Sequence, residues 1–567
     1  MVRGKWIITY NPAEYSYTDI LDSLPDITRR ADENQRDAPY KRISLDKNRE
    51  ININPEHIDI KNILLAYPVL VSDKRWETIH LTSSSLFLGS ALANAGFSVS
   101  TRKLIMPGTT VDKTITGAHL LGLTLFEDLF KEAEDFLLRL SESSFTGLLA
   151  AGGPMVTLNP LQSTRHLPQL NLLVRGEAEF ILPRLLHAVN TGNTAALLES
   201  KGFIFQVPGT LILSDLDHIN RPVDLTPFRF NTGFLEKKHL ENGLEINLSR
   251  GCRRGCVFCS HVQGRRPRQL PPGTFRQLLV DFSARLDSHE IGAPHARTVN
   301  INDDDILQDP EYARTVFQIT RENNFKLWGI QTSVNSFFKK DRTVDALLLD
   351  IVADRSLYVD NNPLTWIGTD AFLKERGKRL GKQIPTETQM LELLGAFEKR
   401  DIRNYHYWIS SDHDTRWDEF AQEFLLIYRL LTRFKTFHLI AHSPFLVPYS
   451  AAPVYNHLIK SPERAGRIKY RQVLSAGNAL FRFPLVERVE TAFPQLNRML
   501  RNEKLENRLG FFDYLKQNDY LNAFITLYNF LKQERLALEA AGTVPGTGTG
   551  QLYQTEQKIE AFISELI

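Results

Sequence analysis

The sequence predicts an α/β protein built from two successive strand–helix regions and a helical C-terminal end. Short apolar runs alternate with amphipathic helical patterns from about residue 56 to 200, and a second alternating series covers 244–455. Strand signals then disappear over 456–567. Because strands that alternate with helices form parallel sheets covered on both faces, we expect a doubly wound domain followed by a partial (β/α)6 barrel.

The first region contains strand patterns that mostly alternate with helix patterns. Its predicted strands are buried apolar runs, and its helices carry apolar residues at helical spacing, such as Leu88, Leu92 and Ala95 before a terminating Gly96. The predicted strands are 62–71, 97–105, 145–151 and 170–174, and the predicted helices are 83–95, 125–143 and 180–189.

The second region contains six apolar runs, most followed by a helical pattern. Six such units predict an incomplete barrel, with its chemistry at the carboxyl ends of the strands. Residues 1–55 are polar and predict an irregular extension, and the Pro-, Asp- and Asn-rich segment 201–243 predicts a linker. The six runs are 244–249, 298–302, 326–333, 363–369, 404–411 and 437–445.

Composition narrows the class of protein. The 567 residues include 68 Lys and Arg against 66 Asp and Glu, and a net charge of +2 gives no reason to expect nucleic acid as a partner. No stretch approaches the roughly 20 apolar residues of a membrane span, and the N-terminus lacks a signal-peptide pattern. Three cysteines within eight residues do not form a disulfide framework, so we expect thiolates in a reducing compartment, the cytoplasm.

The cysteines Cys252, Cys256 and Cys259 lie in the loop after the first predicted barrel strand. Three thiolates in one short loop can face one metal centre, and they leave one iron of a cubane cluster open to a substrate or cosubstrate. A structural zinc site with His261 as fourth ligand, or three unrelated thiols, are the alternatives. Structural zinc sites usually join two short ligand hairpins across a longer loop, which this segment lacks.

The cysteine segment is strongly basic. Between Arg250 and Arg268 the chain has six arginines and no acidic residue. Positive charge lowers the pKa of thiols, stabilises an anionic cluster and attracts an acidic electron donor. A solvated basic loop without a role is the alternative.

The motif CRRGCVFC resembles the cluster-binding signature of the radical S-adenosylmethionine (SAM) superfamily. The resemblance implies a four-iron four-sulfur cluster on the three cysteines, whose open iron binds SAM, and an electron donor such as flavodoxin or ferredoxin. One electron then cleaves SAM to methionine and a 5′-deoxyadenosyl radical, which abstracts hydrogen from a small-molecule substrate. By the same resemblance, SAM is contacted by Phe258, Asp303, Asp304, Asp305, Gln331, Ser333 and Asp370.

The first region, with its motifs AAGGP and VRGEAE, resembles the Rossmann-like cobalamin-binding domain that precedes many radical SAM barrels. The resemblance implies that Gly152, Gly153, Pro154 and Thr157 lie against the nucleotide tail of cobalamin. The cobalt-binding motif Asp-x-His-x-x-Gly is absent, and His218 in the linker lacks the glycine, so we expect no histidine on cobalt. A domain that has lost its ligand is the alternative.

The resemblance favours a cobalamin-dependent methyltransferase acting on an unactivated carbon. A non-methylating cyclisation or rearrangement with the same cofactors, and a non-catalytic iron–sulfur redox protein, are the alternatives. One barrel strand carries candidate pocket or proton-donating residues, which core packing would explain equally well. They are Tyr405, His406, Tyr407, Trp408 and His413, of which Tyr405, Tyr407 and His413 are the catalytic candidates.

Overall fold

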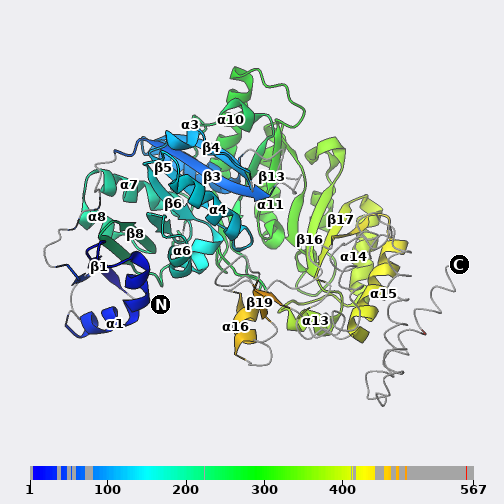
Figure 1. The fold of residues 1–567 in the computed structure, drawn as a ribbon. Helices are drawn as coiled ribbons and strands as arrows, with labels where there is room; N and C mark the ends of the chain where they lie inside the picture. Colours follow the sequence, from blue (N-terminus) through cyan, green and yellow to red (C-terminus); the bar gives the residue numbers. More distant parts are fainter. Residues whose placement is uncertain are drawn as a thin grey trace, which may run out of the picture.

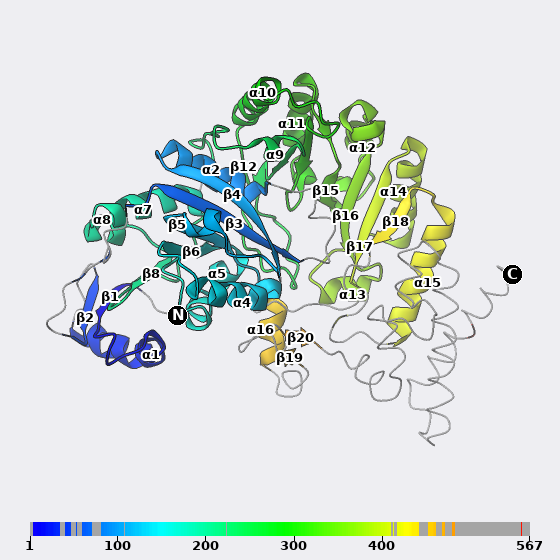
Figure 2. The ribbon, with the colours of Figure 1, turned by 45° about the horizontal axis from the view of Figure 1, so that its top comes forward.

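A computed structural model shows two α/β units side by side, a nine-stranded sheet and a barrel-like set of strands (Figures 1 and 2). Among its described residues, no helix is both long and apolar enough to cross a bilayer. The described residues are 4–34, 40–46, 51, 53, 59–70, 81–106, 108–222, 224–409, 412, 417–440, 452–460, 468–470, 479–481 and 557.

The nine-stranded sheet has a parallel half and a mixed half. The parallel half joins β7 to β6, β5, β3 and β4, and an antiparallel β7–β8–β9–β1 series extends it. The strand order is β2 (Lys41–Ser44), β1 (Lys5–Thr9), β9 (Thr210–Ser214), β8 (Phe203–Val207), β7 (Leu172–Val174), β6 (Leu148–Gly152), β5 (Leu120–Thr124), β3 (Asn62–Leu70) and β4 (Ser98–Met106).

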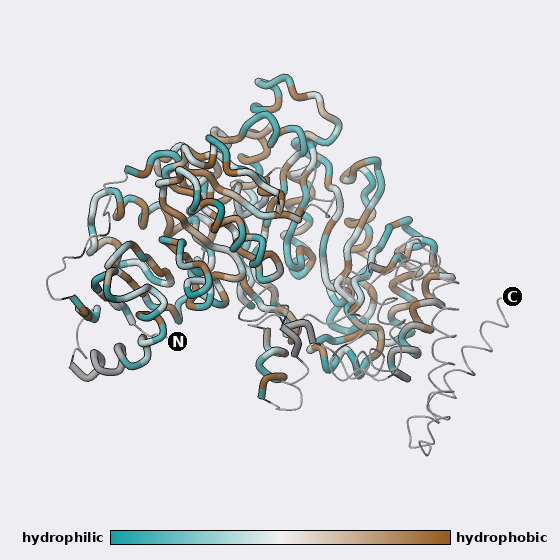
Figure 3. Tube along the Cα trace, in the orientation of Figure 1, coloured by the Kyte–Doolittle hydropathy of each residue, from teal (hydrophilic) through white to brown (hydrophobic). Residues whose placement is uncertain are grey.

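Apolar side chains alternate across this sheet, as expected for strands covered on both faces. On β3, Leu64 and Ala66 enter one core and Ile63 and Leu65 the other. The first core includes α1 (Tyr17–Asn34), α4 (Phe130–Ser141) and α5 (Pro154–Leu158), and the second includes α2 (Ser83–Asn94), α7 (Leu182–Asn190) and α8 (Thr194–Glu199). Figure 3 shows hydrophobic residues recurring along the strands.

Two predictions about this region are wrong, and one strand was not predicted. The segment 1–55 is not an irregular extension, because β1 and β2 belong to the sheet, α1 packs against it and Trp6 is among its buried residues. The segment 201–243 is not only a linker, because β8 and β9 form a hairpin whose turn has Gly209 at a positive φ of 83°. The pattern analysis also missed β5, a five-residue strand directly before the predicted helix at 125–143.

The six predicted barrel runs all contain strands, which confirms the α/β prediction for this region. The third run is divided at Trp328–Gly329, so that β14 pairs with β13 whereas β15 pairs with β16. Every pair is parallel. The sheets are β10 (Leu244–Ile246), β13 (Thr298–Ile301) and β14 (Lys326–Leu327), and β15 (Ile330–Ser333), β16 (Leu364–Asp370), β17 (Arg403–Trp408) and β18 (Phe437–Ile440).

The predicted helical region 456–567 lies mostly outside the described residues. Its described part includes most of α16 (Pro453–Ile459) and an antiparallel strand pair, so a purely helical end is wrong for those residues. The strands are β19 (Ile468–Tyr470) and β20 (Ala479–Phe481).

One hydrophobic core links the two units. Phe87 of α2 packs in the same cluster as the barrel residues, together with Leu225 and Phe228 of the connecting segment. Ser83, in the first turn of α2, accepts a 2.9 Å hydrogen bond from the backbone N–H of Asn247, just beyond the edge strand β10. Through α2, the N-terminal unit therefore packs directly against the edge of the barrel at β10.

Candidate active site

The three cysteines lie on a loop closed by a short antiparallel ribbon, β11 (Ser249–Arg250) and β12 (Arg268–Gln269). Gly251 has a φ of +91°, and a Cβ there would lie 2.7 Å from the carbonyl oxygen of Arg266. Only glycine fits this conformation and this close approach without displacing the chain. The loop therefore begins with a tight turn immediately before the first cysteine.

All three cysteines are free thiols, and Cys256 is buried whereas Cys252 and Cys259 are partly exposed. Burial raises the pKa of each thiol, and Cys259 adds to the rise at Cys256. Metal coordination would deprotonate such thiols. Thiolates are the protein ligands of iron–sulfur clusters, and a cubane binds each through a different iron. The donor set therefore fits a cluster with one open iron.

The zinc alternative required His261 as a fourth ligand. Its ring bonds to the backbone of Cys256, and its Nε2 is buried with no hydrogen-bond partner. Within the described part of the chain, no three His, Cys, Asp or Glu side chains are grouped as ligands of a single ion.

Backbone contacts hold the cysteine loop against the barrel. The N–H of Val257 donates to Leu380, 3.0 Å away, and its carbonyl accepts from Val454 at 2.9 Å. Gly381 has a φ of +67°, and a Cβ there would lie 2.5 Å from the carbonyl oxygen of Gly255. Phe258, predicted to meet adenine, is partly buried against the barrel core.

The predicted carboxylate Asp303 is a positioning residue. It is fully buried and accepts hydrogen bonds from the backbone N–H groups of Leu248 and Ser249, both at 2.7 Å, and from the Ser249 hydroxyl at 2.6 Å. Burial raises the pKa of its carboxyl to about 7. Asp303 therefore anchors the backbone that leads into the cysteine loop.

Asp305 is also occupied by protein partners. It is buried, forms an ion pair with Arg254 at 3.1 Å and accepts hydrogen bonds from Thr332 at 2.6 Å and from Ser336. Because Arg254 belongs to the cysteine loop, this contact ties the loop to β15. Like Asp303, Asp305 holds the site in place.

Asp304 differs from its two neighbours because it is exposed. Surrounding protein nevertheless raises the pKa of its carboxyl by desolvation. Its charge adds to the raised pKa of Cys252 and Cys259. Of the three predicted aspartates, Asp304 alone combines exposure with proximity to the cysteines.

Several other predicted residues share one face of the four-stranded sheet. Partners in a parallel register point to the same side, and alternate residues along each strand do likewise. The hydroxyl of Ser333 on this face is buried and has no hydrogen-bond partner. The face carries Gln331 and Ser333 of β15, Trp366 and Gly368 of β16, Tyr405 and Tyr407 of β17, and His438 of β18.

His406 and Trp408 point to the opposite face and are buried, as the core-packing alternative has it. His406 is fully buried between Thr369 and Asn404, and burial lowers its pKa to about 3. The indole of Trp408 donates to Glu423 at 2.9 Å. His413 lies outside the described residues.

Asp370 lies at the end of β16 with a φ of +64° and forms a buried ion pair with Lys382. Lys382 also donates to the carbonyl of Gly368 at 2.5 Å, and its charge lowers the pKa of Cys256 against the effect of burial. The sequence analysis missed Lys382, which nothing in its local pattern marks. The predicted ligand-binding carboxylate is therefore already paired with a lysine.

The predicted cobalamin turn follows β6. Gly153 has a φ of +90°, and a Cβ there would lie 2.9 Å from the carbonyl of Leu125, whereas a Cβ on Gly152 would meet only the Val174 carbonyl at 3.7 Å. Such glycines fit a turn that a large planar ligand approaches closely. Thr157 is buried, and its hydroxyl oxygen accepts a hydrogen bond from the N–H of Gly176. This hydroxyl therefore stabilises the fold.

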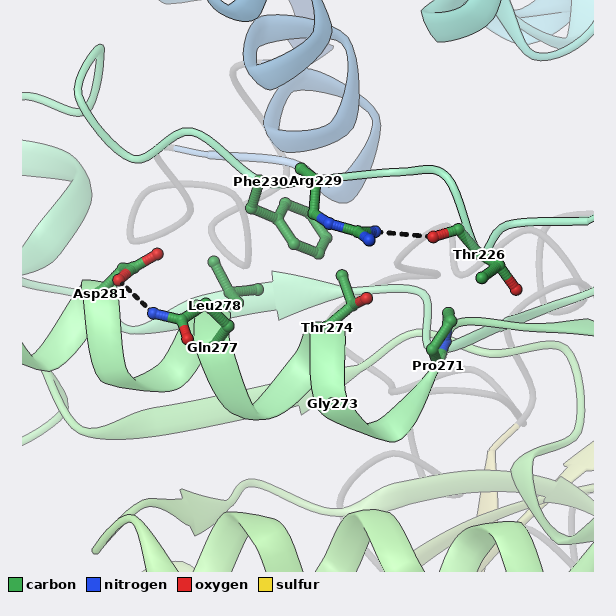
Figure 4. Close-up of a pocket in the computed structure, with 9 residues that line it drawn as sticks. All are labelled: Thr226, Arg229, Phe230, Pro271, Gly273, Thr274, Gln277, Leu278 and Asp281. Atoms are coloured by element: carbon green, nitrogen blue, oxygen red, sulfur yellow. Dashed lines mark hydrogen bonds between the residues drawn. The ribbon is translucent and has the colours of Figure 1, made fainter.

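One cavity lies apart from the predicted site residues. It measures about 370 Å³ and lies between that segment and α10 (Pro272–Ser288) (Figure 4). Arg229 at its wall donates to the carbonyl of Thr226, and Gln277 donates to Asp281. None of the predicted site residues lines it.

Comparisons with known proteins agree with this architecture. No family model matches the chain. The structure of the cobalamin-dependent SAM radical enzyme OxsB, with aqua-cobalamin and SAM bound, matches with a TM-score of 0.60 and 14% identity, over 90% of this chain and 84% of that one. The radical SAM methyltransferase TsrM from Kitasatospora setae, with tryptophan and a SAM analogue bound, matches with a TM-score of 0.51 and 15% identity, over 75% and 80%.

A curated sequence relative matches a shorter segment. It is an uncharacterized methyltransferase of Pyrococcus horikoshii, 30% identical over 118 residues, and the match spans 19% of this chain and 24% of the relative. The chain has the fold of the cobalamin-dependent radical SAM enzymes, as its motifs predicted.

The buried carboxyl of Asp303 predicts a specific pH dependence of stability. Between about pH 4 and its folded-state pKa of about 7, the unfolded chain ionises this group but the folded chain does not. The contribution of Asp303 to the free energy of unfolding therefore falls as pH rises through that window and is constant above it. In urea unfolding of the apoprotein, the wild type should lose more stability between pH 5 and 7 than Asp303→Asn. Equal pH slopes would contradict the buried, protonated assignment.

Proposed function

We propose that the chain is a radical SAM enzyme that holds a four-iron four-sulfur cluster on Cys252, Cys256 and Cys259. The observation that carries the proposal is three free thiols on one loop, at the carboxyl ends of barrel strands where α/β folds bind ligands. A purely redox role would need neither the polar barrel face nor an open iron. The proposal therefore includes binding and reductive cleavage of SAM.

In this proposal the chain binds SAM between the loop and the barrel face. Asp304 supplies a solvent-accessible carboxylate for the amino group, and the unpartnered hydroxyl of Ser333 supplies a donor for an anionic or ribose oxygen. Gln331 lies on the same face as Ser333. Phe258 closes the adenine side through its backbone. Asp303 and Asp305 act indirectly, by fixing the backbone around these groups.

We propose cobalamin as the third cofactor, held at the turn from Gly152 to Thr157. The glycine geometry and the fold of OxsB, whose structure contains aqua-cobalamin, support it. Together the cofactors would supply reductive SAM cleavage and transfer of a one-carbon group. The chain would orient them and exclude water. Without the Asp-x-His-x-x-Gly motif, no histidine is assigned to cobalt.

The reaction we propose is methylation of an unactivated carbon in a small-molecule substrate. The radical SAM methyltransferase TsrM, which shares this fold, supports that choice. The face that carries Tyr405 and Tyr407 would contact the substrate, because both side chains lie in register with Gln331 and Ser333. A cyclisation or rearrangement with the same cofactors is the competing outcome, and product analysis decides between them.

An acidic electron donor, such as flavodoxin or ferredoxin, is the partner we propose for the cysteine loop, and the cytoplasm is the compartment. Three of the six arginines of this segment are in ion pairs, since Arg250 and Arg268 contact glutamates and Arg254 contacts Asp305. The other three, Arg253, Arg265 and Arg266, are exposed. They leave positive charge beside the loop for an acidic partner.

Replacing Cys256 by alanine should abolish both the iron–sulfur absorbance and SAM cleavage after anaerobic reconstitution. The chain has three cysteines in all, so no other thiolate can replace the lost ligand. The neighbouring Ser260→Ala variant should retain both and serves as the control. A Cys256→Ala protein that cleaves SAM at the wild-type rate, or wild-type protein that contains stoichiometric zinc and no iron, would refute the cluster assignment.

Methyl transfer predicts a fixed product ratio. Each methylated product should form with one 5′-deoxyadenosine and one S-adenosylhomocysteine, because one SAM activates the substrate and a second provides the methyl group. Mass spectrometry of reactions with methyl-deuterated SAM should find the label in the product. If deoxyadenosine forms without S-adenosylhomocysteine and the product gains no carbon, the rearrangement replaces methylation, and the SAM assignment is unaffected.

A further inference from the structure

The turn 174–179, with sequence VRGEAE, contacts the predicted cobalamin turn on one side. The guanidinium of Arg175 donates twice to the carbonyl of Thr157, at 2.8 and 2.7 Å. The N–H of Gly176 donates to the Thr157 hydroxyl at 2.9 Å. Both donors come directly after β7, the strand next to β6 in the sheet, so the turn fixes the C-terminal end of the glycine segment.

On its other side the same turn contacts the ribbon that closes the cysteine loop. Glu177 pairs with Arg250 at 2.6 Å and with Arg268 at 2.5 Å, and Glu179 also pairs with Arg250. All four side chains are 10% exposed or less. The pair of Arg268 with Glu177 is buried and bidentate, and such a pair fixes orientation as well as distance.

A second connection runs through the chain after β9. Glu177 donates its N–H to the carbonyl of Asn220 at 2.7 Å, and a Cβ on Gly176 would lie 2.2 Å from that oxygen. The next residue, Arg221, donates to the carbonyls of Val262 at 2.9 Å and His261 at 3.2 Å, inside the cysteine loop. Both ends of the loop are thus tied to the turn at 174–179.

We infer that Glu177 is a positioning residue that couples the cysteine loop to the glycine turn at 152–157. This inference rests on the proposed function for the identity of the two ligands. A cluster that fixes the loop also fixes Arg250 and Arg268, and through Glu177 it orders the turn that faces cobalamin. Ordering one site in advance lowers the cost of binding at the other, and the coupling is reciprocal.

The test compares hydrogen exchange in the full-length protein before and after cluster reconstitution, without cobalamin. In wild type, exchange in peptides covering 152–157 and 174–179 should slow at least about fivefold, the lower end of typical coupling between sites. In the double variant Glu177→Gln/Arg268→Gln, which removes both charges of one pair, the ratio of the exchange rates before and after cluster reconstitution should fall to about one. Glu311→Gln, which breaks an exposed pair with Arg314, should behave as wild type.

A binding readout accompanies the exchange measurement. Titration with hydroxocobalamin should show tighter binding to cluster-loaded than to cluster-free wild type, and no such difference in the double variant. Arg268→Lys keeps the charge but not the bidentate fork, and it provides the same comparison if the double variant does not take up iron. The inference would be overturned if cluster reconstitution slowed hydrogen exchange equally in wild type, in the double variant and in Arg268→Lys. It would also be overturned if exchange did not slow in cluster-loaded wild type. Wild type that forms no cluster would instead refute the proposed function.

Discussion

The structure around the candidate site depends on one constraint: a loop without regular secondary structure must hold three thiols in fixed positions. Such a loop cannot satisfy its own backbone groups, so its neighbours must do so. Val257 is bonded on both sides, by Leu380 and Val454, and Gly381 allows the close approach of Gly255. The segment around Leu380 and the start of α16 therefore hold this loop.

Buried charges gather at the same end of the barrel. Arg376 of α13 (Lys374–Arg379) and Glu423 of α15 (Trp417–Arg433) are fully buried and paired, and Asp412 joins them. Desolvation makes such pairs weak contributors to net stability, although breaking one costs about 3–5 kcal/mol. Their effect is to fix the segment that precedes Lys382. Together with the pairs at Glu177 and Asp305, they form a rigid charged frame around the cysteines.

The sequence was sufficient to predict the cysteine loop and the barrel strands, because their signals are local. Three thiols within eight residues and short apolar runs need no knowledge of distant contacts. The strands β1, β8 and β9 were missed because short runs in polar surroundings acquire their identity only by pairing across the sheet.

Individual roles within the site depended on tertiary structure. The run Asp303, Asp304 and Asp305 offers three equivalent carboxylates in sequence, and only the positions of Ser249 and Arg254 show that two of them are occupied. Tyr405 and Tyr407 similarly lie on one face of the sheet and His406 on the other, because alternate residues of a strand point to opposite faces. Which residues of β16 share the face of the two tyrosines is known only from the register of β17 with β16. The side-chain partners of Glu177 lie more than 70 residues away along the chain, so no local pattern reveals them.

The central claim, that three cysteines leave one iron open to SAM, is tested most directly by electron paramagnetic resonance. The reconstituted protein is reduced anaerobically and its cluster spectrum is recorded before and after addition of SAM. The account predicts the signal of a reduced four-iron four-sulfur cluster whose g values shift when SAM binds the open iron. A cluster spectrum that SAM leaves unchanged would contradict it.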